Sequence, residues 1–181
     1  NGYVRKEGTL LNDSILIGRW KLYKDRQLQE IIEFKNIRNK SYLNQNWIFD
    51  KKGDTIGGNY FYKKYEDTVV LGQKNRIHLY FNDYSISEKS NSYLLVPKYG
   101  YNLDPKFTNE NRIPLDTIKN LSDKNMDVLE LNGLENDIIL DIYSKETGKK
   151  NFRAILINHI VQTKEVLKDR KFYIEFNYFV Q

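Results

Sequence analysis

Apolar and polar residues alternate with a period of two in several segments of the second half of the chain. Ile77, Leu79 and Phe81 occupy alternate positions, and His78 and Tyr80 lie between them. The same alternation runs through 138–143 and, over a longer span, through 172–180. Because successive side chains of a strand point to opposite faces of a sheet, each segment is predicted to be a β-strand with one buried face.

Three other segments carry different patterns. The segment 92–96 is a short apolar run that Pro97 ends, so it is predicted to be a strand. The segment 152–161 is apolar on both faces, which indicates a central strand covered on two sides. In the less regular middle of the chain, 98–133, the segment 116–121 is predicted to form a short helical turn.

The first third of the chain contains an internal repeat over 18–62. A shift of 27 residues places Trp20 on Trp47, Leu22 on Phe49 and Phe34 on Phe61. In each copy two apolar runs flank a polar turn, at 24–26 and at 52–54, which is a hairpin pattern. The second turn contains Gly53, which adopts positive φ at no steric cost, and the pair 57–58 is predicted to form a bulge. Both tryptophans are predicted to pack in the core or between hairpins.

An aromatic residue, a polar turn and a strand that ends in an aromatic residue, repeated within 18–62, resemble the bacterial MORN-type repeat. The chain departs from that pattern at Arg26, where the repeat has a turn glycine, and at 36–39, which lacks the connecting glycines. The resemblance implies a meander of β-hairpins that serves binding or scaffolding and not catalysis. It also implies an alternative, the antitoxin-like role of some bacterial relatives of the repeat.

The segment 67–74 is the predicted boundary between two domains, 1–66 and 67–181. The second domain is predicted to be an antiparallel β-sandwich, because short strands alternate with turns. Its end, 137–180, resembles an immunoglobulin-like domain of bacterial envelope lipoproteins, and 67–72 fits the opening of that pattern. The residues that carry this resemblance are Gly148, Lys149, Asn151, Arg153, Ile155 and the closing strand 173–180; Ala154 stands where the pattern has a glycine. It implies location in the cell envelope or secretion, with a lipid anchor upstream of Asn1 as the only link to a membrane.

The composition agrees with an all-β protein and excludes several kinds of functional site. The chain has 181 residues, 40% of them hydrophobic, with 14 tyrosines and 9 phenylalanines, which suit pleated sheets. It has no cysteine, so disulfides and thiolate metal sites are excluded. The net charge of +5 is modest. The basic residues of 145–150 and 164–171 are expected at opposite ends of a sheet, so no nucleic-acid partner is predicted.

Candidate catalytic groups are sparse. The two histidines are His78 and His159; His159 is predicted to be a buried core residue, and no metal or cofactor is predicted. The segment 50–54 lacks the closing glutamate of a calcium loop and is better explained as a hairpin turn. Asp141 and Glu175 leave open an alternative function, a glycan-acting hydrolase, which requires both carboxylates in one cleft.

Four aromatic residues gather near prolines and a glycine in the irregular middle of the chain. Exposed aromatic side chains on ordered loops offer rigid contact area, and tyrosine adds a polar tip. The sequence therefore predicts a partner-binding loop made of Tyr93, Tyr99, Tyr101 and Phe107. The function it favours is a non-enzymatic binding or scaffold protein of the bacterial cell envelope, whose partner is a protein or a surface polymer.

Overall fold

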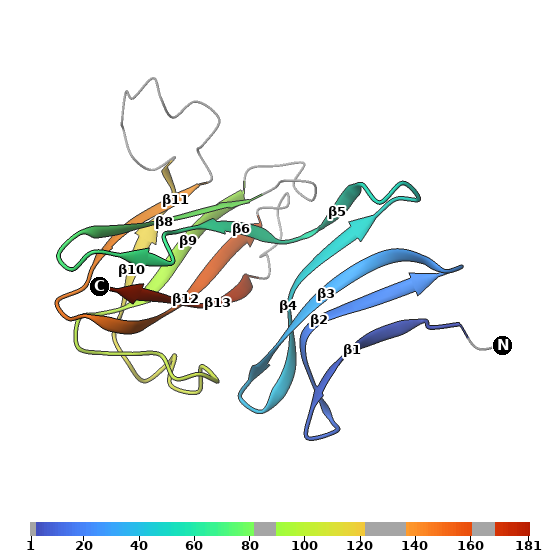
Figure 1. Ribbon diagram of the computed structural model, residues 1–181, viewed down its shortest axis with the longest axis horizontal. Coiled ribbons are helices and arrows are strands. Elements are labelled where there is room, and N and C mark those ends of the chain that lie inside the picture. Colours follow the sequence, from blue (N-terminus) through green and yellow to red (C-terminus); the bar gives the residue numbers. More distant parts are fainter. Residues whose placement is uncertain (1–2, 82–89, 122–136, 161–168) are drawn as a thin grey trace. The chain divides into compact units, whose positions relative to one another are not determined.

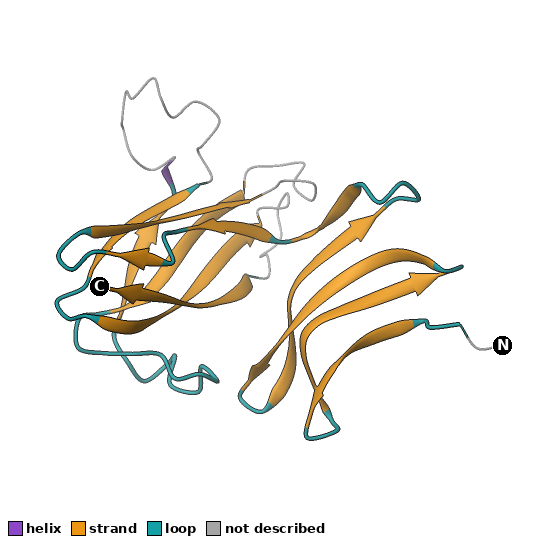
Figure 2. Ribbon diagram, viewed as in Figure 1, coloured by secondary structure: helices purple, strands orange, loops and turns teal. Residues whose placement is uncertain are grey.

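The structure is a computed structural model that describes residues 3–81, 90–121, 137–160 and 169–181 (Figure 1). The elements of these residues are thirteen strands, which Figure 2 draws in orange, and a 3₁₀ turn at Leu121, drawn in purple. The prediction of an all-β protein is confirmed.

The chain divides into two compact units. Unit 1 holds Asn1–Tyr60 and a later segment, Asp104–Asn111, whereas unit 2 takes most of the chain after Tyr60. The first unit therefore ends between Tyr60 and Phe61, a few residues before the boundary expected after residue 66. Asp104–Asn111, which the sequence places inside the second domain, folds with the first unit.

Unit 1 is built on a single five-stranded antiparallel sheet whose strands follow one another in chain order. The strands are β1 (Lys6–Leu11), β2 (Ile15–Lys24), β3 (Gln27–Ile37), β4 (Lys40–Phe49) and β5 (Thr55–Asn59). The turns that join the first four strands each contain a pair of residues with φ between 51° and 66°: Asn12–Asp13, Asp25–Arg26 and Arg38–Asn39. Successive pairs lie 13 residues apart. Paired positive φ values match the right-handed twist of hairpin strands, so evenly spaced turns of the same kind produce the meander.

The two tryptophans of the sequence repeat project from opposite faces of this sheet. Trp20 lies opposite Ile32, which lies opposite Asn46, the neighbour of Trp47. Residues paired across strands share a face, whereas neighbours along a strand do not. The physical period is therefore 26 residues, twice the turn spacing, and the 27-residue alignment is one residue out of register. The expectation that Trp20 and Trp47 occupy equivalent positions is wrong.

The predicted features of the second hairpin are present. Gly53 has a φ of 89° in the turn after β4, as the sequence predicts. The register between β4 and β5 shifts at Ile56, so the bulge lies one residue before the glycine pair at which it was expected. Gly58 follows with a φ of 121°, and a Cβ atom there would lie 2.2 Å from the Asn46 carbonyl oxygen, so only glycine fits.

Unit 2 contains two sheets. The larger has the order β10-β9-β12-β13-β7, made of Leu115–Lys119, Ser90–Pro97, Gly148–Ile160, Arg170–Val180 and Thr68–Val69. The smaller has the order β11-β8-β6, made of Ile138–Tyr143, Lys74–Phe81 and Phe61–Lys64. All pairs are antiparallel except β13 with β7. The prediction that 152–161 belongs to a central strand is confirmed for its described part, because β12 pairs with β9 on one side and β13 on the other.

The core of unit 2 gathers the inward-facing residues of both sheets, which therefore pack on each other. Ile77 and Leu79 of β8 are 0% and 1% exposed, as their alternation predicts. The alternate residues of β13 from Phe172 to Val180 also lie in this core. Phe176 stacks on Tyr65 with ring centroids 3.9 Å apart, so aromatic contacts fill the space between the sheets.

The expected helical turn at 116–121 is wrong. Leu115–Lys119 forms strand β10, whose residues pair with Tyr93 to Pro97 of β9. This segment has no clear alternation, because it is an edge strand and both Asp116 and Thr117 are exposed. Long-range pairing with β9 overrides its weak local preference.

Candidate functional site

Two exposed aromatic side chains of unit 2 lie on one tight turn, 98–101, called here the tyrosine turn. Tyr99 is 89% exposed and Tyr101 is 50% exposed. The Tyr101 amide donates a hydrogen bond to the Lys98 carbonyl oxygen at 3.0 Å, and Gly100 has a φ of 86°, so the turn is an ordered element. The Lys145 ammonium lies 5.0 Å from the centroid of the Tyr99 ring. The turn presents rigid aromatic area beside basic side chains.

The other two residues of the predicted loop lie elsewhere. Tyr93 is half-buried in β9, and this burial raises the pKa of its hydroxyl. Phe107 is 1% exposed and belongs to unit 1, whereas Tyr99 and Tyr101 belong to unit 2. The prediction that Phe107 is an exposed contact residue is wrong, because a turn from Asp104 to Phe107 directs this side chain inward. Tyr99 and Tyr101 alone are brought together as predicted.

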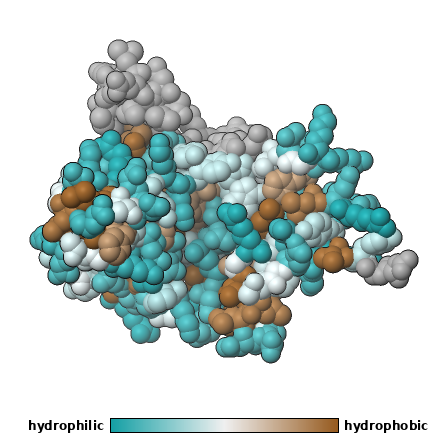
Figure 3. Space-filling view, in the orientation of Figure 1, coloured by the Kyte–Doolittle hydropathy of each residue, from teal (hydrophilic) through white to brown (hydrophobic). Residues whose placement is uncertain are grey.

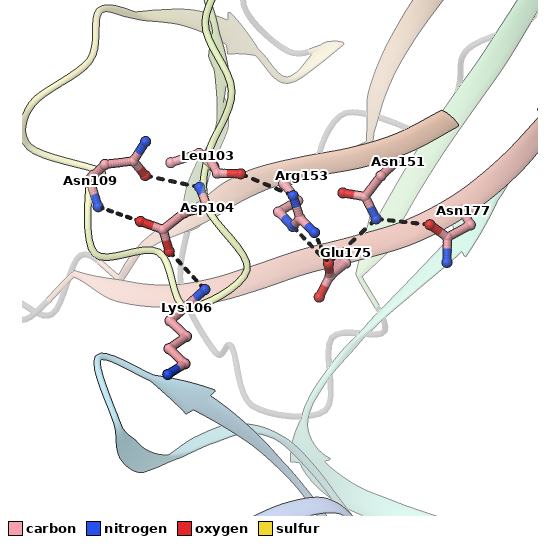
Figure 4. A network of polar contacts seen from close by, with 8 residues as sticks. All are labelled: Leu103, Asp104, Lys106, Asn109, Asn151, Arg153, Glu175 and Asn177. Carbon is pink, nitrogen blue, oxygen red and sulfur yellow. Dashed lines mark hydrogen bonds and ion pairs between the residues drawn. The ribbon is translucent and has the colours of Figure 1, made fainter. Parts of the chain in front are cut away.

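The turn that buries Phe107 is organised by one carboxylate. Asp104 accepts hydrogen bonds from the backbone amides of Lys106 and Asn109 (Figure 4). It also accepts from the backbone amide and the hydroxyl of Thr108. Partial burial raises the pKa of Asp104, but these hydrogen bonds outweigh it and hold the pKa below its ordinary value. Asp104 therefore orders the backbone of the loop, and its acceptor capacity is used within it.

The two carboxylates of the hydrolase alternative do not share a cleft. Glu175 lies on the outer face of the larger sheet of unit 2 and accepts from Arg153, whose guanidinium also donates to the Leu103 carbonyl oxygen (Figure 4). Asp141 lies on the outer face of the smaller sheet, where the Arg76 guanidinium holds it at 2.8 and 2.9 Å. The hydrogen bonds from Arg76 hold the pKa of Asp141 below its ordinary value. Each carboxylate is ion-paired on its own side of the two-sheet core.

The described histidine side chain is part of a row of rings on the smaller sheet. His78 Nε2 lies 2.6 Å from the carboxylate of Asp137, which is 6% exposed. The ring of His78 lies 5.2 Å from that of Tyr80, which stacks on Tyr62 at 5.0 Å. The His159 side chain, predicted to be buried, lies outside the described residues. Within the described ranges, the structure has no group of three or more histidines or carboxylates that could hold a metal ion.

One face of the sheet of unit 1 carries six apolar side chains next to polar ones such as Glu30 and Asn46. Cross-strand pairing places on this face six apolar side chains of β2, β3 and β4: Trp20, Leu22, Ile32, Phe34, Leu43 and Ile48. All six are at least partly exposed, and Leu43 and Ile48 are each 40% exposed. These six residues define the apolar face. In the space-filling view, brown apolar surface is visible over the part of the molecule that Figure 1 draws as β1–β5 (Figure 3).

The opposite face of the same sheet mixes paired polar side chains with apolar ones, because cross-strand pairing also places Ile31 and Trp47 on it. Glu33 of β3 accepts hydrogen bonds from the side chains of Asn44 and Gln45. The Arg19 guanidinium lies 5.2 Å from the centroid of the Trp47 ring. Glu7 of β1 accepts a hydrogen bond from the Tyr23 hydroxyl, which lowers the pKa of Glu7 and raises that of Tyr23. Both faces of the sheet therefore carry apolar and charged side chains.

Sequence reasoning missed the apolar face because two bulges interrupt the alternation that would reveal it. The register between β2 and β3 shifts after Leu22, and that between β3 and β4 shifts after Glu33. Within β2, Trp20 and Leu22 do alternate with Arg19 and Lys21. That short alternation is the sequence pattern that indicates the apolar face.

The chain matches no protein-family model, no curated protein and no solved structure. Among the residues that the structure describes, no helix has the length and apolar character needed to cross a bilayer.

Proposed function

We propose that this chain is a non-enzymatic binding or scaffold protein of the bacterial cell envelope, and that the tyrosine turn contacts its partner, a protein or a surface polymer. The observation that carries this proposal is the exposure of Tyr99 and Tyr101, 89% and 50%, on a hydrogen-bonded turn. Large aromatic side chains held in a fixed conformation lose little entropy on binding, so they make effective contact residues.

The arrangement of unit 2 supports an immunoglobulin-like fold within this proposal. In such domains three strands in the order C-F-G form one sheet, and strands A, B and E lie in the other. Here β9-β12-β13 and β6-β8-β11 take those places in chain order. The chain lacks the cysteines of antibody domains, and both tryptophans lie in unit 1, so the likeness rests on topology.

The arrangement of unit 1 supports a MORN-like meander, because its strands pair in sequence order and its first three turns are evenly spaced. The opposite orientation of Trp20 and Trp47 departs from a strict repeat. The MORN resemblance implies binding or scaffolding, and the resemblance of 137–180 to a domain of envelope lipoproteins is the basis for the location proposed.

Affinity capture tests the function. The purified chain serves as bait for envelope and cytosolic fractions, and retained proteins and polymers are identified by mass spectrometry. We expect one envelope component to be retained by the native chain and lost with the double change Tyr99→Ala and Tyr101→Ala. The melting temperature should stay nearly constant, because both side chains are exposed.

Tyr143 provides a matched control, because it is a 65% exposed tyrosine of the same unit. Tyr143→Ala should leave capture unchanged. Equal loss with Tyr143→Ala, or capture that survives the double change, would show that the tyrosine turn is not the contact site. Failure to retain any component from either fraction would contradict the proposed function.

A further inference from the structure

A cavity lies at one end of the sheet of unit 1. It has a volume of about 390 Å³ and is lined by residues 3–5, which lead into β1, and by residues 23–26, at the turn between β2 and β3; it is called here the end cavity. Figure 1 shows these two parts of the chain at the same end of the sheet. The Tyr23 amide donates to the Arg5 carbonyl oxygen at 2.8 Å, so a backbone hydrogen bond joins them. Cavities of about 300 to 1,000 Å³ are typical of small-molecule sites, so this one has room for a ligand.

Cations predominate among the residues of the end cavity. Arg5, Lys24 and Arg26 line it, and Asp25 is the one acid among its lining residues. None of these three cations forms an ion pair with another residue that the structure describes. Three cations and one acid leave an excess of two positive charges, so the cavity favours an anion that carries two negative charges. A phosphate monoester has a charge of about −1.5 to −2 near neutral pH, and a carboxylate has a charge of about −1.

Arg26 has a backbone conformation that its residue type does not favour. Its φ is 66°, in the left-handed region that glycine and asparagine adopt more readily. Arg38, in the next turn, has a φ of 52°, and its guanidinium binds the carboxylate of Glu110 at 2.6 Å. Arg26 binds no carboxylate in the part of the chain that the structure describes. An anionic ligand in the end cavity would therefore take the place at Arg26 that Glu110 takes at Arg38.

The Arg26 guanidinium is held in place by Tyr3. It lies 4.0 Å from the centroid of the Tyr3 ring and donates a hydrogen bond to the Tyr3 hydroxyl. A guanidinium has further N–H donors, whose planar arrangement matches two oxygens of a phosphate. The Tyr23 hydroxyl donates to Glu7 at 2.7 Å, so Tyr23 offers the cavity its ring. The two rings and Val4 give the cavity an apolar wall, on which the C–H face of a sugar ring can pack.

We infer that the end cavity binds a sugar phosphate, whose phosphate monoester is held by Arg26, Arg5 and Lys24 and whose sugar ring packs on the tyrosine rings. The phosphate accounts for the excess positive charge, and the sugar ring accounts for the remaining volume and the apolar wall. The inference goes beyond the proposed partner contact and does not rest on it, because the tyrosine turn belongs to unit 2 and the end cavity belongs to unit 1.

Isothermal titration calorimetry on the full chain at low ionic strength tests the inference. The probes are glucose 6-phosphate, ribose 5-phosphate, inorganic phosphate and glucose. At least one sugar phosphate should bind at least about tenfold more tightly than inorganic phosphate and than glucose, because it alone engages both the cations and the rings. Failure of both sugar phosphates to bind overturns the inference, as does an equal affinity for inorganic phosphate.

Two substitutions in the turn change the affinity in opposite directions. Arg26→Gly removes the guanidinium and supplies a residue that favours positive φ, so it should weaken sugar phosphate binding at least about tenfold without lowering the melting temperature. Asp25→Asn removes the one acid that lines the cavity and should tighten binding at least about twofold. Binding that survives Arg26→Gly, or that weakens with Asp25→Asn, would overturn the inference.

Lys24 and Lys40 provide a matched pair of variants, because both are exposed lysines of unit 1 and they lie at opposite ends of β3. Lys24→Gln should weaken sugar phosphate binding at least about threefold, because Lys24 lines the end cavity. Lys40→Gln removes the same charge outside the cavity and should leave the affinity unaltered. An equal loss in both variants would show that binding follows the overall charge of the chain and would overturn the inference.

Discussion

At the scale of single residues, the hairpin turns of unit 1 hold six non-glycine residues at positive φ. Backbone sterics disfavour this region for residues with a Cβ atom, and asparagine and aspartate tolerate it best. Asn12, Asp13, Asp25 and Asn39 fit that preference, whereas Arg26 and Arg38 do not. The absence of a turn glycine at Arg26 is therefore a local departure that the pairing of long strands outweighs.

This strain can be relieved at the second turn. The double change Asp25→Asn and Arg26→Gly gives the sequence preferred in such turns and should raise the free energy of unfolding by about 1 kcal/mol. Loss of the contact between Arg26 and the Tyr3 ring will offset part of this gain. Urea unfolding followed by tryptophan fluorescence measures the change, because both tryptophans lie in unit 1.

Gly53→Ala provides the opposite case. Gly53 has a φ of 89°, and a Cβ atom there would meet no other atom within 4 Å, so the cost is backbone strain alone. This variant should lower the free energy of unfolding by about 1 kcal/mol. Equal stability of the Gly53→Ala variant and the native chain would contradict the strain argument.

At the scale of elements, period-two alternation predicts a strand well when one face of the strand is buried. It predicts a strand poorly when neither face is buried. The 172–180 pattern identified the inward residues of β13 correctly, because the core of unit 2 covers that face. Strand β10 carries exposed residues in most positions and was mistaken for a helical turn. The loop 104–111 carries no periodic signal, and its order depends on hydrogen bonds to one carboxylate.

The Asp104 loop should weaken in acid. The folded-state pKa of Asp104 is lowered, so its contribution is fully present above the unfolded-state value of 3.8 and is lost as pH falls through the folded-state pKa. The stability difference between the native chain and Asp104→Asn should therefore be largest near neutral pH and shrink below about pH 4. Urea unfolding at a series of pH values measures this difference.

Asp141 also has a lowered pKa, but it is present in both the native chain and Asp104→Asn. The stability difference between these two chains therefore reports on the Asp104 carboxylate. Asp141→Asn is the control, because its partner Arg76 lies in unit 2 and its loss should not alter the tryptophan-detected transition. A difference between native and Asp104→Asn chains that stays constant across the pH series would show that the Asp104 carboxylate is not the titrating group.

At the scale of the whole molecule, the segment Asp104–Asn111 ties the late part of the chain to the first unit. Arg38 of the third turn donates to Glu110 at 2.6 Å, and the Glu110 side chain is 3% exposed. The Arg38 amide also donates to the Lys106 carbonyl oxygen. Unit 1 is therefore completed by residues that follow it in sequence by more than forty positions.

Replacing 104–111 with glycine and serine residues of equal number should destabilise unit 1 by on the order of 3 kcal/mol or more, because it removes buried Phe107 and leaves Arg38 without Glu110. The tryptophan-detected urea midpoint measures this loss. The variant with both Tyr99→Ala and Tyr101→Ala serves as the control and should keep the native midpoint. An unchanged midpoint in the replaced chain would show that unit 1 is complete without this segment.

The sequence by itself determined the all-β class, the positions of the alternating strands and the exposure of Tyr99 and Tyr101. These features follow from local properties, namely period-two patterning and turn residues, which act over a few positions. The tertiary structure alone decided the assignment of 104–111 to unit 1, the burial of Phe107, the separation of Asp141 from Glu175 and the opposite orientation of the two tryptophans. Each of these depends on strand register or long-range packing, where a one-residue shift reverses a face and no local pattern records the outcome.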